Sequence, residues 1–68
     1  MLNQEQAREK IMELKNIYGF TYRYIAELLG ISASHIYHFM VGTRNLKRDK
    51  IFKLERIISR KGEEDMNV

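Results

Sequence analysis

The sequence predicts an all-α fold, a compact bundle of four to five short helices. Apolar residues recur at intervals of three and four, proline is absent, and the four glycines fall where helices would end. A chain of 68 residues has room for one hydrophobic core and therefore for one domain. We place this domain at residues 1–61 and expect residues 62–68 to form an acidic, disordered tail.

The first helix is expected to run from a cap at Asn3 to about Tyr18, where Gly19 ends it. Its apolar residues follow the spacing of one buried stripe, with charged residues between them: Ala7, Ile11, Leu14 and Tyr18.

Two short helices follow, over residues 22–29 and 33–41. Thr21 and Ser32 each offer a side-chain oxygen to the free amides of the helix that follows. Gly30 ends the first of the pair. Helices this short are unstable alone, so they must form by packing on each other and on their neighbours.

After a loop over residues 42–45, a last helix is expected from about Leu46 to Lys61. Its core stripe consists of Ile51, Leu54 and Ile58. Phe52 and Ile57 lie to either side of this stripe, too far apart for both to be deeply buried in one monomer, so one of them is a candidate dimer contact.

Basic charge is concentrated near the C-terminus. Residues 44–61 carry eight basic side chains against two acidic ones, whereas the charges of residues 1–43 cancel. Such a stretch suits a polyanion, and its plain alternative is a solvated helix face. Cysteine is absent, which excludes disulfides and cysteine-ligated metals. Without a long apolar run or a signal-peptide pattern, we expect a cytoplasmic protein with no membrane contact.

The central pair of helices resembles the helix-turn-helix of the Cro and lambdoid-repressor type of DNA-binding domain. Five residues carry the resemblance, which covers roughly residues 4–61: Ala26, Gly30, Ile31, Ile36 and Phe39. It implies a small transcriptional regulator that binds double-stranded DNA sequence-specifically, of phage or mobile-element type, and represses by promoter occlusion. Tyr22 and Ala33 stand where members of this family often carry glutamine.

On this resemblance the second short helix reads bases in the major groove with its outward side chains, Ala33, Ser34, Tyr37 and His38. Two clusters are expected to contact phosphates: Thr21, Tyr22 and Arg23, and then Arg44, Asn45, Lys47 and Arg48. For Arg23, Lys50 and Lys53, the alternative to a phosphate contact is that the charged side chain only keeps the surface soluble. No Arg, Lys, Asn or Gln lies between Ser32 and Val41, which weakens direct base readout.

Other chemistry has little support in the sequence. His35 and His38 are three residues apart but lack a neighbouring acidic or cysteine ligand, so we expect no metal, no cofactor and no enzyme activity. The main rival to DNA binding is a protein-interaction module on the same scaffold, which would bind a second regulatory protein or a polymerase. A basic helix docking on an anionic membrane is a weaker rival, because the core needs its apolar stripe.

Overall fold

The computed structural model describes the backbone of residues 1–66 and the side chains of residues 1–62. Within this range it contains four helices and no strand, which confirms the all-α prediction. The helices are α1 (Gln4–Tyr18), α2 (Tyr22–Leu29), α3 (Ala33–Val41) and α4 (Arg48–Met66).

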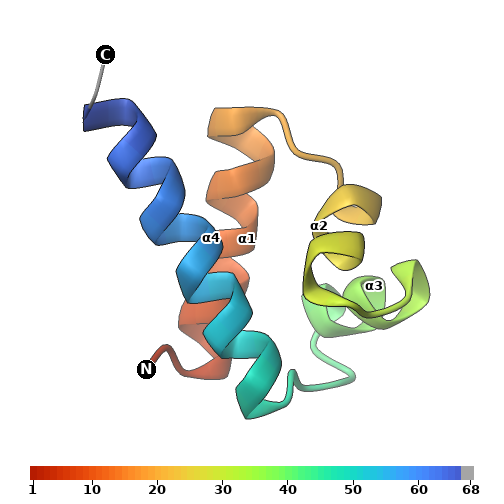
Figure 1. The fold of residues 1–68 in the computed structure, drawn as a ribbon. Coiled ribbons are helices and arrows are strands. Elements are labelled where there is room, and N and C mark those ends of the chain that lie inside the picture. The colour runs from red at the N-terminus through yellow and green to blue at the C-terminus, as the bar shows by residue number, and fades with distance from the viewer. Residues whose placement is uncertain (67–68) are drawn as a thin grey trace.

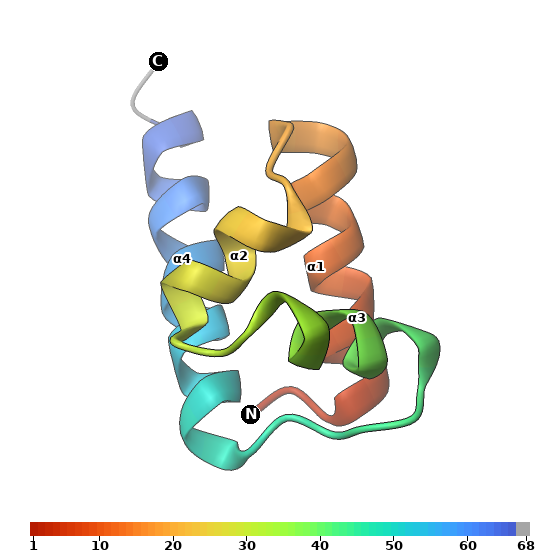
Figure 2. The same cartoon turned by 90° about the vertical axis from the view of Figure 1, so that its right-hand side faces the viewer.

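The two longer helices, α1 and α4, lie side by side and run in the same direction, with α2 and α3 packed against one side of this pair (Figures 1 and 2). Figure 2 shows α2 crossing in front of the pair, with α3 below it, near the N-terminal ends of α1 and α4. The short helices are therefore held by the longer ones, as their length requires.

Each predicted cap is present. A side-chain oxygen accepts the amide three residues further on in three places: Asn3 from Gln6 at 2.8 Å, Thr21 from Tyr24 at 3.0 Å, and Ser32 from His35 at 3.0 Å. Gln6 also accepts from the Asn3 amide at 2.9 Å, which completes a capping box at the start of α1. These local contacts explain why the observed bounds of α1, α2 and α3 agree with the sequence.

The core consists of side chains from all four helices and from the loop before α4. Among the residues with described side chains, no polar or charged residue is buried. The largest side chain at the centre is Phe39, which is fully buried together with Ile11, Leu14 and Leu54 of the predicted stripes and with Ile25, Leu29 and Ile36 of the two short helices. Each such side chain contributes roughly 1.5–3 kcal/mol relative to an exposed position. Ile58, predicted for the core, is half-buried and packs at its edge.

The last helix differs from the prediction at both ends. It begins at Arg48 and not at Leu46, because Gln4 takes both the amide and the carbonyl of Leu46 and holds that residue in the loop. It continues through Gly62 to Met66, where a disordered tail was expected, since Gly62 does not adopt the positive φ of a helix-ending glycine. The rest of the predicted tail, residues 67–68, lies outside the described residues.

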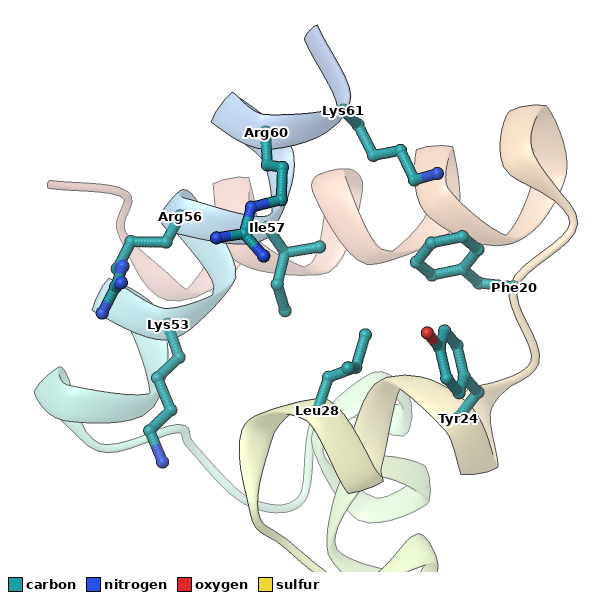
Figure 3. A pocket seen from close by; sticks show the side chains of 8 residues that line it. All are labelled: Phe20, Tyr24, Leu28, Lys53, Arg56, Ile57, Arg60 and Lys61. Carbon is teal, nitrogen blue, oxygen red and sulfur yellow. The ribbon is translucent and has the colours of Figure 1, made fainter. Parts of the chain in front are cut away.

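A groove of about 550 Å³ separates α2 from α4 (Figure 3). One wall is formed by residues from the segment that leads into α2 and from α2 itself, and the other by two turns of α4. None of its lining residues belongs to α3.

Candidate functional site

The turn between α2 and α3 is fixed by backbone hydrogen bonds. Gly30 has φ +73°, and its amide donates to Glu27 at 3.1 Å, while the Ile31 amide donates to Ala26 at 3.0 Å. A side chain at Gly30 would be strained in this left-handed conformation. Ser32 caps α3 directly after this turn, so local hydrogen bonds and the packing of α2 on α3 both hold the two helices together.

One face of α3 is buried and the opposite face is open. Ile36 and Phe39 are fully buried. The four residues predicted to contact bases are all exposed: Ala33, Ser34, Tyr37 and His38. Tyr37 and Val41 are 57% and 56% exposed, which makes this face a mixture of apolar and polar groups. The structure therefore brings the predicted base-contacting residues together on one accessible surface.

At the C-terminal end of this face, the His38 ring is held in place. Its Nδ1 lies 3.2 Å from Thr43 Oγ1, and the same hydroxyl donates to the His38 carbonyl oxygen at 3.1 Å. The ring of Tyr37 meets the imidazole edge-on, with centroids 5.8 Å apart. Sequence reasoning missed Thr43, because a contact between a helix and the loop that follows it has no periodic signal.

The first predicted phosphate cluster is divided in the structure. Thr21 uses its hydroxyl to cap α2, and Arg23 is exposed. Tyr22 is half-buried and leans on α1: its hydroxyl donates to the Met12 sulfur at 3.3 Å, and the Lys15 ammonium lies 5.3 Å from its ring centroid. Of the three side chains, Arg23 is the most available for a phosphate.

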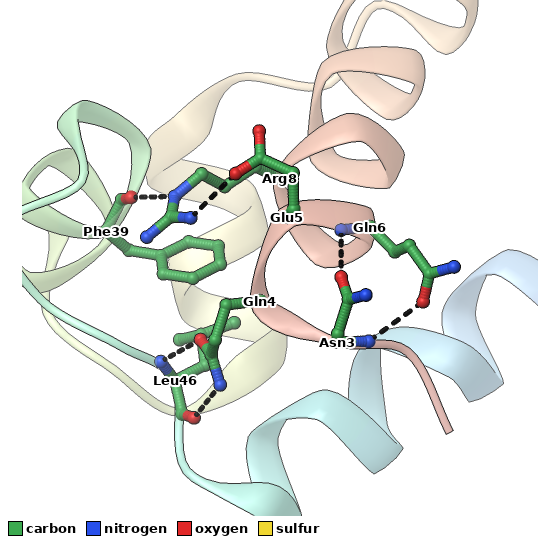
Figure 4. Close-up of polar contacts among 7 residues, drawn as sticks. All are labelled: Asn3, Gln4, Glu5, Gln6, Arg8, Phe39 and Leu46. Atoms are coloured by element: carbon green, nitrogen blue, oxygen red, sulfur yellow. Dashed lines mark hydrogen bonds and ion pairs between the residues drawn. The ribbon is translucent and has the colours of Figure 1, made fainter.

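The second predicted cluster lies in the loop before α4 and in its first turn. All four members are exposed: Arg44, Asn45, Lys47 and Arg48. The loop that carries them is pinned to α1, because Gln4 accepts the Leu46 amide at 2.9 Å and donates to its carbonyl at 3.0 Å (Figure 4). His35 Nε2 lies 3.4 Å from the Asn45 carbonyl and ties the loop to α3 as well.

Arg8 joins α1 to the end of α3 (Figure 4). Its Nε donates to the Phe39 carbonyl at 2.7 Å, and its guanidinium carbon lies 4.6 Å from the centroid of the Phe39 ring. A cation at a helix C-terminus is favoured by the exposed carbonyl groups there. Arg8 and Gln4 thus position α3 and the basic loop relative to each other, although neither stood out in the sequence.

Lys50 and Lys53 converge on the C-terminal end of α2. Their ammonium nitrogens lie 3.4 and 3.6 Å from the point that a Cβ on Gly30 would occupy. Positive charge at this end complements the helix dipole of α2. The sequence suggests either a phosphate contact or solubility for these lysines. Their place at the end of α2 adds a third, structural role.

Within the described residues, no group of three or more His, Cys, Asp or Glu side chains could hold a metal ion. No helix in that part of the chain combines the length and apolar character needed to cross a membrane. Comparisons with known proteins find no matching family model, no matching curated protein and no matching solved structure. The fold and this surface define the protein only as an all-helical domain with a central helix-turn-helix.

Proposed function

We propose that this protein binds double-stranded DNA sequence-specifically and acts as a small transcriptional regulator, with α3 as its recognition helix. The observation that supports this most is the exposed face of α3, which follows a hydrogen-bonded turn and precedes a basic loop that Gln4 holds against α1. A major groove about 12 Å wide admits one helix of this kind.

In this proposal, phosphate contacts supply most of the affinity and base contacts supply the preference. The exposed basic residues of the loop, with Arg23 on α2, lie against the DNA backbone. The Ala33 methyl group suits contact with a thymine methyl, while Ser34, Tyr37 and His38 offer hydrogen-bonding groups to base edges.

The simplest mode of regulation for such a domain is occlusion, in which the bound protein blocks the polymerase from a promoter. A phage or mobile-element repressor is the type of regulator that the helix-turn-helix resemblance implies. Dimerisation on DNA would let two recognition helices read half-sites about 34 Å apart.

Titration with duplex DNA at several salt concentrations tests the proposal. If about four to six phosphates are neutralised, the logarithm of the association constant should fall against the logarithm of salt concentration with a slope of about −4 to −5. Selection from a random duplex pool then identifies the preferred site. If no duplex in the pool binds the protein at low salt, the proposal is overturned.

A second candidate is a protein-interaction module that uses the same face of α3 to bind another regulator or a polymerase. The exposure of Tyr37 and Val41, at 57% and 56%, favours this candidate, because aromatic and aliphatic side chains are typical of protein interfaces. Substituting Val41 with serine discriminates the two: it should weaken a protein contact strongly and leave the phosphate-dominated affinity for DNA almost unchanged.

A further inference from the structure

The groove between α2 and α4 has an apolar floor. Phe20, Tyr24 and Leu28 line it from the α2 side, and Ile57 points from α4 toward Leu28 (Figure 3). Tyr24 and Leu28 are 47% and 38% exposed, and the Phe20 and Tyr24 rings meet edge-on with centroids 5.1 Å apart. Apolar side chains gathered in a concave, accessible surface are typical of a docking site.

The α4 wall of the groove is basic. Lys53, Arg56 and Arg60 follow one another at intervals of three and four, so they form one stripe along the helix. None of these three forms an ion pair among the described side chains. A fourth cation, Lys61, lies at the end of the groove with its ammonium 5.2 Å from the Phe20 ring centroid. Among the side chains that the structure describes, residues 1–62, none that lines the groove is acidic.

We propose that this groove binds an amphipathic helix of a partner protein that carries acidic residues along one flank. The lining of α4 from Lys53 to Lys61 spans roughly 12 Å, which is about two turns of a partner helix. Apolar residues at i, i+4 and i+7 of that helix would fill the floor, and carboxylates spaced by three and four would face the cations of α4. The α2 side of the groove is apolar and aromatic, so the acidic residues of the partner helix belong only on the flank that faces α4.

This arrangement fits a peptide better than it fits a phosphate backbone. A phosphate backbone would pair with the cations but would leave Tyr24, Leu28 and Ile57 uncovered, whereas an amphipathic helix satisfies both walls. The groove shares no residue with the exposed face of α3 or with the basic loop before α4. The inference therefore goes beyond the proposed DNA binding and does not depend on it.

The test uses a fluorescein-labelled synthetic helix of about four turns, with leucines at i, i+4, i+7 and i+11 and glutamates along one flank. We expect the full-length protein to bind it with a dissociation constant in the micromolar range, on the order of 1–100 μM. Amide chemical-shift changes should be concentrated at Phe20, Tyr24, Leu28 and Ile57. Two control peptides, one with glutamines for the glutamates and one with the leucines distributed around the helix, should each bind about tenfold or more weakly.

Two double variants with the same net charge separate the groove from general electrostatic attraction. Arg56→Glu with Arg60→Glu should weaken peptide binding at least about tenfold, while Arg44→Glu with Lys47→Glu, which leaves the groove intact, should change it less than about threefold. All four side chains are exposed, so both variants should keep the wild-type circular dichroism spectrum. Leu28→Gln tests the apolar floor separately and should also weaken binding.

Equal losses in the two double variants would overturn the proposal, because general charge would then explain the binding. No peptide binding by the folded wild-type protein would overturn it as well. Binding to phosphatidylglycerol vesicles is the third outcome that would overturn the proposal. If Arg56→Glu with Arg60→Glu abolished vesicle binding but left peptide binding unchanged, the groove would serve a lipid surface.

Discussion

The His38 imidazole and the Thr43 hydroxyl determine each other's hydrogen positions. Thr43 Oγ1 donates its one hydrogen to the His38 carbonyl oxygen, so toward His38 Nδ1 it can act only as an acceptor. In the neutral ring, the hydrogen then resides on Nδ1, and Nε2 is left as an acceptor. This tautomer is inferred from the hydrogen-bond pattern.

The first prediction follows from that tautomer and, for its DNA readout, from the proposed function. An acceptor in the major groove favours the amino groups of cytosine or adenine. Thr43→Val keeps the side-chain shape but removes the oxygen, so it should reduce the preference for the contacted base by about two- to fivefold, because a bidentate base contact is worth about 1–3 kcal/mol and His38 offers only one acceptor. Binding to duplexes that differ at single positions measures this change.

Two controls accompany the Thr43 variant. In a His38→Ala background, Thr43→Val should have no further effect on base preference, because the two residues act as one unit. Nitrogen-15 spectra of the imidazole report the tautomer without any DNA. An unchanged tautomer in Thr43→Val would contradict the hydrogen-bond argument, whatever the DNA does.

The second prediction separates the two faces of α3. Ile36 is fully buried, so Ile36→Asp places an unpaired carboxylate in the core, and its cost of several kcal/mol is comparable to the whole stability of a small domain. We expect this variant to be unfolded by circular dichroism. Ser34→Ala with His38→Ala changes only exposed side chains and should keep the melting temperature within a few degrees. A double variant that retained full sequence preference would argue against α3 as the reader.

The helices could be predicted because their signals are local. Asn3, Thr21 and Ser32 are capping residues, and Gly30 is the residue that a left-handed turn requires, so each marks an end within one turn of itself. Gly62 misled the prediction, since a glycine inside a helix costs only about 1 kcal/mol and ends it only when the chain turns left-handed.

The residues that position the candidate site could not be predicted in the same way. Gln4 contacts Leu46, which is 42 residues away, and Arg8 contacts Phe39, which is 31 residues away. A glutamine and an arginine on the first helix carry no pattern that distinguishes them from solvated neighbours. Only the packing of α1 against α3 and the loop before α4 reveals their partners.

The third prediction tests that positioning. Gln4→Ala leaves the partly buried Leu46 amide and carbonyl without their partner, so it should lower the free energy of unfolding by about 1–3 kcal/mol. Hydrogen exchange at the Leu46 amide should become much faster. Gln6→Ala, which removes only part of the exposed cap of α1, serves as the matched control and should leave exchange at Leu46 unchanged. Equal exchange in both variants would show that Gln4 does not hold the loop.

The fourth prediction concerns the basic loop. Arg44 and Lys47 are exposed, and neither takes part in an ion pair among the described side chains, so their removal should not affect folding. Arg44→Ala and Lys47→Ala should each weaken binding to all duplexes alike and reduce the magnitude of the salt slope by about one. Lys10→Ala, on α1, removes the same charge but should leave the slope unchanged. A change in sequence preference without a change in slope would assign these residues to bases and not to phosphates.

The last prediction uses the structure to choose between the two candidate dimer contacts on α4. Phe52 is 53% exposed, whereas Ile57 is half-buried and faces α2 across the groove. Of the two candidates, Phe52 is therefore the side chain that the monomer leaves uncovered, and a symmetric contact through it would bury an aromatic ring on each chain. If the protein dimerises through this helix, Phe52→Ala should raise the dimer dissociation constant by tenfold or more, since loss of a well-packed aromatic anchor costs about 2 kcal/mol or more. Lys53→Ala, at the neighbouring position, should change the dimer dissociation constant little.

Sedimentation equilibrium over micromolar to millimolar concentrations measures the dissociation constants of both variants. A wild-type protein that stays monomeric throughout, and whose cooperative DNA binding is unaffected by Phe52→Ala, would rule out this contact.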